Sequence, residues 1–348
     1  MKDFLVAVVG REGSFSRYWI KYCDANGISY KIVNGYDQDI ISQLSSVDAL
    51  LWNWELESPQ EALVARHVIY AAELMGLKVF PDTATCWSYD DKVSQKYQLE
   101  SVGAPLVPTY VFFDKPSAMA WVEQASFPKV FKLRKGAGSK NVRLVHSVYQ
   151  AKSLVKWAFG RGFKPLRFFG DALGRLATGS QQQRLVLLRK VKRFPQRLLE
   201  VYRVNKTMGR ERGYAYFQDF IRDNKFDTRI TVVGGRYAFG FTRNVRKGSF
   251  RASGSGSIDY DIGRINPRCV EIAFDVARKL KAQSIAFDFL TDHAGNPLIT
   301  EISYAYVAEA VYNCSGYWDA DMQWHEGHFW PTDLILIDLL EHLRQAKR

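Results

Sequence analysis

The 348-residue sequence contains no apolar run that approaches the ~20 residues needed to cross a bilayer. Its first residues, MKDFLVAVVGREG, carry an acid at position 3 and only a strand-length apolar run, which argues against a signal peptide. The cysteines are scattered and form no CxxC pair, so neither a zinc site nor a disulfide framework is indicated. These absences predict a protein of the reducing cytoplasm. The four cysteines are Cys23, Cys86, Cys269 and Cys314.

Two common nucleotide-binding signatures are also missing. The GREGS segment after the first apolar run is not a complete GxGxxG fingerprint, and KGAGSK at 135–140 lacks the GxxxxGK[ST] order of a P-loop. The histidines form no catalytic or metal-binding cluster, because His293 falls in a turn and His325 and His328 have no third ligand at a suitable spacing. We interpret these histidines as surface or structural residues.

The composition is ordinary for a soluble globular protein, with 47% hydrophobic and 24% charged residues, but the net charge of +12 is unevenly placed. Segment 160–213 holds 14 Lys or Arg against three acids, a net charge of +11, so the rest of the chain is nearly neutral. Such a segment favours an acidic partner: a phosphorylated or uronic substrate, an anionic membrane surface or nucleic acid. The alternative is a solvated, poorly ordered insertion.

The first 85 residues alternate between strand and helix patterns. The apolar run 4–9 is the first strand, and Ser58–Gly76 is a helix with good capping residues at both ends. This alternation predicts a parallel, doubly wound sheet that binds ligands at the carboxyl ends of its strands. Those ends carry Gly10 with Arg11, and the segment Trp52–Glu55.

After Thr83 the pattern changes. A helix is predicted from about Ser88 to Ser101, and on it Lys92 and Lys96 lie four residues apart on one face. The strand KVFKLR then runs into the small-residue loop KGAGSK and a second strand, NVRLV. Glycine lets backbone amides crowd an anion and nearby lysines add charge, so a hairpin loop of this kind can fold over phosphates, although most such hairpins bind nothing.

The segment Ser284–Tyr304 predicts a hairpin of two apolar strands joined by a polar turn. Each strand carries one carboxylate, Asp288 and Glu301, among residues typical of a core. An ionised carboxylate in such surroundings is costly unless a cation or hydrogen-bond donors compensate it, so two on adjacent strands suggest a shared divalent metal. The alternative is that both acids lie on the solvent face of an alternating hairpin.

Taken in order, these features resemble the ATP-grasp superfamily, closest in pattern to its ribosomal-protein glutamate ligase and D-alanine–D-alanine ligase branch. The resemblance implies an α/β and α+β chain, in which an N-terminal doubly wound parallel-sheet domain precedes two subdomains that clamp ATP. We expect domain boundaries at 1–85, 86–213 and 214–348, with the basic insertion 160–213 inside the second domain.

The resemblance also assigns nucleotide-binding residues. Lys96 and Lys132 are expected on the phosphates, with the glycine-rich loop as a flap over them. YFQDFI is similar to the linker that grips adenine through its backbone, and Gln218 or Asp219 stands where the family usually has glutamate. The expected nucleotide-binding residues are Lys96, Lys132, Gly136, Ala137, Gly138, Ser139, Gln218, Asp219, Phe220 and Ile221.

Asp288 and Glu301 fall on the two metal-binding carboxylates of the family. Ser303 stands where the family usually has a metal-binding asparagine, and Ser253 where asparagine is common. A serine hydroxyl ligates hard cations less often, so the number of magnesium ions stays open. One magnesium can still be held by the two acids, because this ion keeps several waters and takes substrate phosphates as ligands.

The implied activity is that of an ATP- and Mg-dependent carboxylate-amine or carboxylate-thiol ligase. An acyl phosphate would form on a small-molecule carboxylate, such as a sugar acid or an amino acid, and ADP and phosphate would be released. Arg229, Arg243 and Arg251 are the basic candidates for stabilising the anionic intermediate. The aromatic-rich segment after Glu301, together with Trp52 and Trp54, is a candidate acceptor wall, and a core under a loop is the alternative.

Two other functions remain open. The same nucleotide site could serve a kinase that uses a hydroxyl acceptor. The chain could also be a non-catalytic nucleotide-dependent module in which segment 160–213 binds an anionic polymer. The oligomeric state is not indicated by the sequence.

Overall fold

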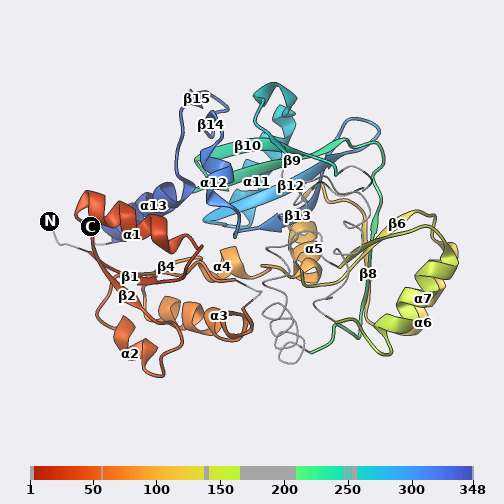
Figure 1. The fold of residues 1–348 in the computed structure, drawn as a ribbon, viewed down its shortest axis with the longest axis horizontal. Helices are drawn as coiled ribbons and strands as arrows, with labels where there is room; N and C mark the ends of the chain where they lie inside the picture. Colours follow the sequence, from red (N-terminus) through yellow and green to blue (C-terminus); the bar gives the residue numbers. More distant parts are fainter. Residues whose placement is uncertain are drawn as a thin grey trace, which may run out of the picture. The chain divides into compact units, whose positions relative to one another are not determined.

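The computed structural model describes most of the chain (Figure 1). The described residues are 4–55, 58–136, 141–164, 209–246, 248, 250, 252 and 257–346. The chain divides into two compact units. The first unit consists of Met1–Leu56, Gln60–Pro108 and Ile221–Arg348, and the second of Glu57–Pro59 and Thr109–Phe220.

These boundaries differ from the expected ones at 85/86 and 213/214. Helix α5 (Lys92–Ser101) belongs to the first unit because its residue Gln95 hydrogen-bonds to strand β13 (Pro297–Ser303) of that unit. Strand β8 (Ala215–Asp219) belongs to the second unit because it lies between two strands of that unit's sheet. The N-terminal sheet and the large C-terminal sheet share one unit because they share a hydrophobic core.

The N-terminal part of the first unit is a parallel sheet. Its strands are β1 (Leu5–Val9), β2 (Ser29–Val33), β3 (Ala49–Leu51) and β4 (Lys78–Phe80), in the order β2-β1-β3-β4. Its helices are α1 (Ser16–Asn26), α2 (Ile40–Leu44), α3 (Pro59–Leu74), the short α4 (Thr83–Cys86) and the C-terminal α13 (Pro331–Ala346). Figure 1 shows α1 and α13 on one side of the sheet and α2 and α3 on the other. The central strands are therefore buried apolar runs, and the predicted doubly wound arrangement is confirmed.

The C-terminal part of the first unit is built on a seven-stranded sheet with the order β13-β12-β9-β10-β14-β15, in which β11 pairs with β10. The further strands are β9 (Phe226–Val233), β10 (Tyr237–Asn244), β11 (Ile258–Asp259), β12 (Ser284–Thr291), β14 (Gly316–Trp318) and β15 (Trp324–Glu326). The helical segments are η1 (Ile262–Arg264), α11 (Pro267–Lys279) and α12 (Ala308–Tyr312). Alternate residues of β9 and β12, among them Ile230 and Phe287, pack on α11. The predicted hairpin of β12 and β13 is confirmed.

A β-bulge interrupts the pairing of β12 with β13. Asp288 pairs with Glu301, but the next residue, Phe289, pairs with Ile299, so Thr300 is the extra residue. A bulge of this kind changes which face the following side chains occupy. Ile299 and Ile302 consequently both pack in the core beneath α11, while Glu301 lies opposite Asp288 on the other face.

The second unit is a smaller antiparallel sheet with two helices. Its strands are β5 (Thr109–Phe112), β6 (Lys129–Lys132), β7 (Val142–Val145) and β8, in the order β5-β8-β6-β7. Helices α6 (Lys115–Gln124) and α7 (Val148–Ala158) cover one face, where Phe131 and Phe217 form the core with alanines and valines of both helices. Among the helices of the described chain, none is long and apolar enough to span a membrane.

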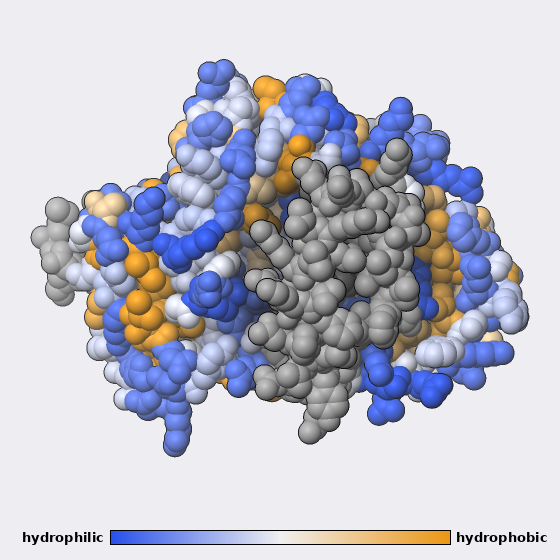
Figure 2. Space-filling model, in the orientation of Figure 1, coloured by the Kyte–Doolittle hydropathy of each residue, from blue (hydrophilic) through white to orange (hydrophobic). Residues whose placement is uncertain are grey.

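The surface seen in Figure 2 is hydrophilic over large areas, with a hydrophobic area over the N-terminal sheet. Strand β2 forms one edge of that sheet, and its residue Ile32 is 62% exposed. A single exposed apolar residue on an edge strand is common, and it does not by itself mark a binding surface.

Replacing Phe287 by alanine tests the core under α11. Phe287 is fully buried between β12 and α11, so we expect Phe287→Ala to lower the free energy of unfolding by about 3–5 kcal/mol. The exposed Val307→Ala is the control and should change it by less than about 0.5 kcal/mol. Urea unfolding of the full chain measures both values. Equal effects for the two variants would contradict this account of the core.

Candidate functional site

A row of charged side chains lies on the face of the large sheet that is turned away from α11. Strand residues two apart point to the same face, and directly paired residues of neighbouring strands do so too. Register therefore places these residues together, and we call the row the charged face. From β10 to β13 its members are Arg243, Asp227, Arg229, Asp288 and Glu301.

Asp288 is held by two arginines of this face. Arg229 donates from Nε to Oδ1 at 2.7 Å and from Nη2 to Oδ2 at 2.9 Å, and Nη2 of Arg243 lies 2.8 Å from Oδ2. Asp288 is only 7% exposed, and burial by itself would raise the pKa of its carboxyl. The two arginines outweigh burial and hold that pKa well below its ordinary value, so Asp288 is ionised at neutral pH.

Arg243 is shared between two acids. It donates from Nε to Oδ1 of Asp227 at 2.7 Å and from Nη2 to Oδ2 of Asp227 at 2.6 Å, while the same Nη2 reaches Asp288. Both members of the Arg243–Asp227 pair are buried and directly opposite in register. Within the described ranges, neither Arg229 nor Arg243 makes a hydrogen bond from Nη1, which leaves one donor group on each for a ligand.

Glu301 is compensated by Lys92, a residue of α5. The Lys92 side chain is almost fully buried, and its Nζ lies 3.1 Å from Oε1 of Glu301 and 3.8 Å from Asp90. Burial lowers the pKa of Lys92, but Glu301 and Asp90 outweigh it, and the net effect is a raised pKa. Glu301 itself keeps a side chain that is 33% exposed, so this carboxylate remains accessible to a ligand.

Helix α5 also fixes the backbone beside Glu301. The Gln95 amide donates to the carbonyl of Ile302 at 2.9 Å and accepts from the Ile302 amide at 3.3 Å. The lysine and the glutamine together hold β13 at its bulge. The sequence places Lys92 on the same helix face as Lys96 but predicts no role for it. The signal in the sequence is a lysine that directly follows two aspartates, because a lysine that becomes buried requires an acidic partner.

Positive and negative charges alternate along the charged face except at one place. Arg243 faces Asp227 and Arg229 faces Asp288, but Asp288 faces Glu301. Like charges directly opposite each other in a sheet are destabilising, so this is where an added cation would be most favourable. The described residues contain no group of three His, Cys, Asp or Glu that could hold a metal ion. Two carboxylates suit magnesium, which takes one or two protein carboxylates and completes its shell with water and phosphate oxygens.

The remaining residue expected at the metal is Ser303. It follows Glu301 by two positions on β13, and its hydroxyl donates to the carbonyl of Ala305 at 3.0 Å. Its metal-binding role stays a prediction. The structure thus brings Asp288 and Glu301 together and adds Lys92, Arg229 and Arg243 as their counterions.

The expected phosphate-binding lysines lie in different units. Lys96, in the first unit, binds Glu100 one turn along α5 at 2.6 Å and lies 4.7 Å from the Tyr97 ring centroid. Lys132, in the second unit, is buried and donates to Oε1 of Gln218 at 2.6 Å. The phosphate roles of both lysines stay predictions.

Gln218 and Asp219 point to opposite faces of the second unit's sheet. Gln218 joins Lys132 and Thr109 on the face away from α6 and α7, with a hydrogen bond of 3.0 Å to the Thr109 hydroxyl. Asp219 lies on the helix-covered face and forms an ion pair of 2.5 Å with Lys129. Of the two residues, Gln218 is therefore the one that shares a face with the expected phosphate-binding lysine.

For the remaining expected residues, the described part of the chain shows no contact that bears on their proposed roles. Phe220 and Ile221 follow β8 at the chain boundary between the units, and Gly136 is the last described residue at the start of the glycine-rich loop 135–140. Its φ of 125° is a left-handed value that favours glycine. The expected residues outside the described ranges are Ala137, Gly138, Ser139, Arg251 and Ser253.

The carboxyl ends of β1 and β3 meet as the sequence predicted. Arg11, after β1, binds the Glu55 carboxylate at 2.6 Å and the Asn53 carbonyl at 3.2 Å, and its Nε lies 3.4 Å from the buried Glu61. The strand order changes direction between β1 and β3, and ligands of open α/β sheets bind at such a point.

The candidate acceptor wall is corrected by the structure. Trp52 and Trp54 are buried in the core of the first unit, and so is Tyr304, which packs against Trp54 with ring centroids 6.2 Å apart. Large aromatic side chains contribute most where they are removed from water, so the alternative of an aromatic core holds for these residues.

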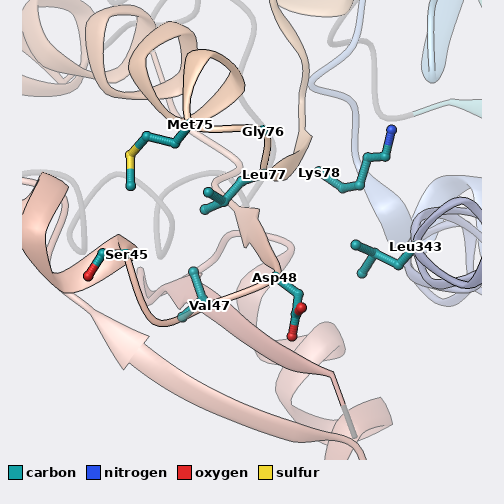
Figure 3. Close-up of a pocket in the computed structure, with 8 residues that line it drawn as sticks. All are labelled: Ser45, Val47, Asp48, Met75, Gly76, Leu77, Lys78 and Leu343. Carbon is teal, nitrogen blue, oxygen red and sulfur yellow. The ribbon is translucent and has the colours of Figure 1, made fainter. Parts of the chain in front are cut away.

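A hollow of about 500 Å³ lies at the amino ends of the strands of the N-terminal sheet, opposite to the ends that carry Arg11 and Glu55 (Figure 3). It is found where β3 and β4 begin, whereas ligands of such sheets bind where the strands end. Figure 3 shows the Lys78 ammonium directed away from Asp48, whose Oδ2 already accepts a hydrogen bond from the Leu5 amide. We do not assign a ligand to this hollow. Its lining residues are Ser45, Val47, Asp48, Met75, Gly76, Leu77, Lys78 and Leu343.

Comparison with known proteins identifies the fold. No family model and no curated protein matches the sequence. Among solved structures, the D-alanine–D-alanine ligase from Bacillus anthracis complexed with ATP is similar over 99% of this chain and 100% of its own, with a TM-score of 0.60 and 11% identity.

Two further structures agree. The RimK domain ATP-grasp protein from Sphaerobacter thermophilus DSM 20745 is similar over 97% of this chain and 99% of its own, with a TM-score of 0.53 and 14% identity. The D-alanyl-alanine synthetase A from Vibrio cholerae is similar over 99% of both chains, with a TM-score of 0.59 and 11% identity. The chain therefore has the ATP-grasp fold, as its sequence predicted, and at this identity the likeness shows the fold alone.

Lys92 and Lys96 provide a matched pair for testing the counterion of Glu301. Lys92→Met keeps most of the apolar stem but removes a buried charge, so we expect a loss of about 1–3 kcal/mol in the free energy of unfolding. Lys96→Met removes an ion pair within one helix and should cost about 0.5 kcal/mol or less. Urea unfolding at neutral pH compares them, and a smaller effect for Lys92→Met than for Lys96→Met would refute the assignment.

The acid dependence of stability tests the arginine pairing of Asp288. Its pKa is lowered in the folded state, so the pairing contributes fully above the unfolded value of about 3.9 and is lost as pH falls toward the folded value. Asp288→Asn should therefore be less stable than the parent at pH 7, and the difference should shrink below about pH 4.

Urea unfolding at pH 7 and at pH 3 measures the Asp288 effect. Glu123→Gln is the control, because Glu123 forms an exposed pair with Lys152 and should have little effect at either pH. A stability difference for Asp288→Asn that is the same at both pH values would show that the arginines do not stabilise the ionised carboxylate.

Proposed function

We propose that this chain of ATP-grasp fold is an ATP- and magnesium-dependent ligase that joins a small-molecule carboxylate to an amine or a thiol. The observation that carries the proposal is the single like-charge pair in the register of the charged face, where Asp288 lies opposite Glu301. Three protein cations lie beside these two acids: Lys92 pairs with Glu301, and Arg229 and Arg243 pair with Asp288.

The two acids would hold magnesium, and the fit rests on their chemistry. Both are oxygen ligands on directly paired residues, Glu301 is partly exposed, and Oδ1 of Asp288 accepts only one hydrogen bond from the described residues. Magnesium bound there would neutralise charge on the phosphate oxygens of ATP during transfer. One ion is the number that these two carboxylates support.

The protein cations have a second task in this proposal. The Nη1 groups of Arg229 and Arg243 would donate hydrogen bonds to the anion that develops as the phosphoryl group moves to an acceptor oxygen. Lys96 and Lys132 remain the residues proposed for the outer phosphates of ATP, and the backbone of Gln218–Ile221 the segment proposed for adenine. Phosphoryl transfer to a carboxylate needs little general-base catalysis, so this proposal gives no role to a histidine.

The acceptor is assigned to the ends of β1 and β3. Arg11 and the exposed Glu55 lie at the point where ligands of such sheets bind, and together they can contact an acid and an amine. A small substrate with one or both groups, such as an amino acid or a sugar acid, suits this pair. Segment 160–213 with its net charge of +11 would favour an anionic substrate or partner.

The activity is tested by ADP release in a screen of amino acids and sugar acids, with hydroxylamine present. A carboxylate acceptor gives an acyl phosphate, which hydroxylamine converts to a hydroxamate. We expect Glu301→Gln to lower kcat at least ~100-fold, because the like-charge contact is removed together with one metal ligand. Glu326→Gln, on the exposed strand β15, is the matched control and should retain activity.

Each contrary result has a clear meaning. A stable phosphate ester with no hydroxamate would identify a kinase with a hydroxyl acceptor. Nucleotide-dependent binding of RNA or DNA that survives Glu301→Gln, without ADP release, would identify a non-catalytic module. Full activity of Glu301→Gln would contradict the proposed role of the charged face.

A further inference from the structure

We propose that Asp227 is a positioning residue that sets the metal affinity of this site by withholding Arg243 from Asp288. The inference rests on the proposed function, because it assumes that Asp288 is a metal ligand. Asp227 itself touches neither metal nor nucleotide in this scheme. It acts through the arginine that it shares with Asp288.

The geometry makes Arg243 a divided cation. Two of its three ion-pair contacts go to Asp227, at 2.7 and 2.6 Å, and one goes to Asp288, at 2.8 Å. All three side chains are buried, so their interactions are weakly screened by water and salt. Arg229, in contrast, gives both its Nε and its Nη2 to Asp288.

A metal at Asp288 must compete with these arginines for the carboxylate oxygens. Asp288 accepts one hydrogen bond at Oδ1 and, counting the contact with Arg243, two at Oδ2. If Asp227 lost its charge, Asp288 would be the one ionised carboxylate that Arg243 contacts, and the positive charge of Arg243 would no longer be shared between two acids. The carboxylate would then be over-compensated, and a divalent cation would gain less by binding to it.

Stability alone does not account for the acid at position 227. Buried ion pairs contribute little net stability relative to apolar side chains of similar volume, because desolvation offsets the attraction. A single arginine, Arg229, already neutralises Asp288 with ideal bidentate geometry. Arg243 adds a donor for an anionic ligand, and Asp227 lets the sheet carry that extra cation without closing Asp288 to a metal.

The scheme predicts opposite effects on metal and on nucleotide. Asp227→Asn adds one positive charge to the face, so divalent metal should bind more weakly while metal-free nucleotide, an anion, should bind more tightly. Arg243→Gln removes one positive charge, so divalent metal should bind more tightly and metal-free nucleotide more weakly. A residue that only supports the fold would weaken both kinds of binding together.

The experiment measures Mn²⁺ binding to the full chain saturated with ADP, by the electron paramagnetic resonance signal of free Mn²⁺, and separately ADP binding in EDTA. For Asp227→Asn we expect the Mn²⁺ dissociation constant to rise about tenfold or more, and the ADP dissociation constant in EDTA to fall. Arg243→Gln should lower the first and raise the second. Asp259→Asn is the matched control. Asp259 lies on the neighbouring strand β11 and pairs with Arg264, so this substitution should leave both dissociation constants unchanged.

The outcomes separate this inference from the proposed function. If the parent chain with ADP binds no Mn²⁺, the proposed metal site fails and the inference fails with it. If the parent binds Mn²⁺ but Asp227→Asn binds it equally well, or loses both ligands in parallel, only the inference is overturned. If Asp227→Asn does not fold, Arg243→Gln decides, and unchanged or weaker Mn²⁺ binding in that variant overturns the inference.

Discussion

Charge compensation at Asp288 is the constraint on which the rest of the site depends. A carboxylate with so little contact with water needs cations, and neighbouring strands supply two arginines at hydrogen-bond distance. Arg243 in turn pairs with Asp227, and Glu301 pairs with Lys92 from a helix that lies elsewhere in the sequence. Each charged residue of this face is therefore paired with one of opposite sign. In the register of the face, only Asp288 and Glu301 lie opposite each other with the same sign.

A β-bulge and one glutamine side chain are enough to place Glu301 opposite Asp288. One extra residue in β13, Thr300, allows two isoleucines to enter the core and still places Glu301 opposite Asp288. Gln95 then fixes the bulged strand through both hydrogen bonds of its amide. A shift of one residue in this register would turn Glu301 toward α11 and away from Asp288.

Much of the architecture could be read in advance, because hydrophobic periodicity reports burial directly. Short apolar runs alternating with helices indicated the parallel sheet, and the apolar segment with its polar turn indicated the β12–β13 hairpin. The order of motifs pointed to the ATP-grasp fold, which structural comparison confirms. The boundaries of the units were not predictable in the same way, because they depend on which distant strands pair.

The sequence by itself determined the parallel sheet and the β12–β13 hairpin that carries Asp288 and Glu301, since these follow from local patterns of apolar and polar residues, and the resemblance of its motifs indicated the fold. Only the tertiary structure decided what surrounds those carboxylates. The choice of Lys92 as the partner of Glu301, the division of Arg243 between two acids and the burial of Trp52 and Trp54 arise from contacts between residues far apart in the chain. Electrostatic interactions act over a few ångströms of space, and a linear pattern does not contain those distances.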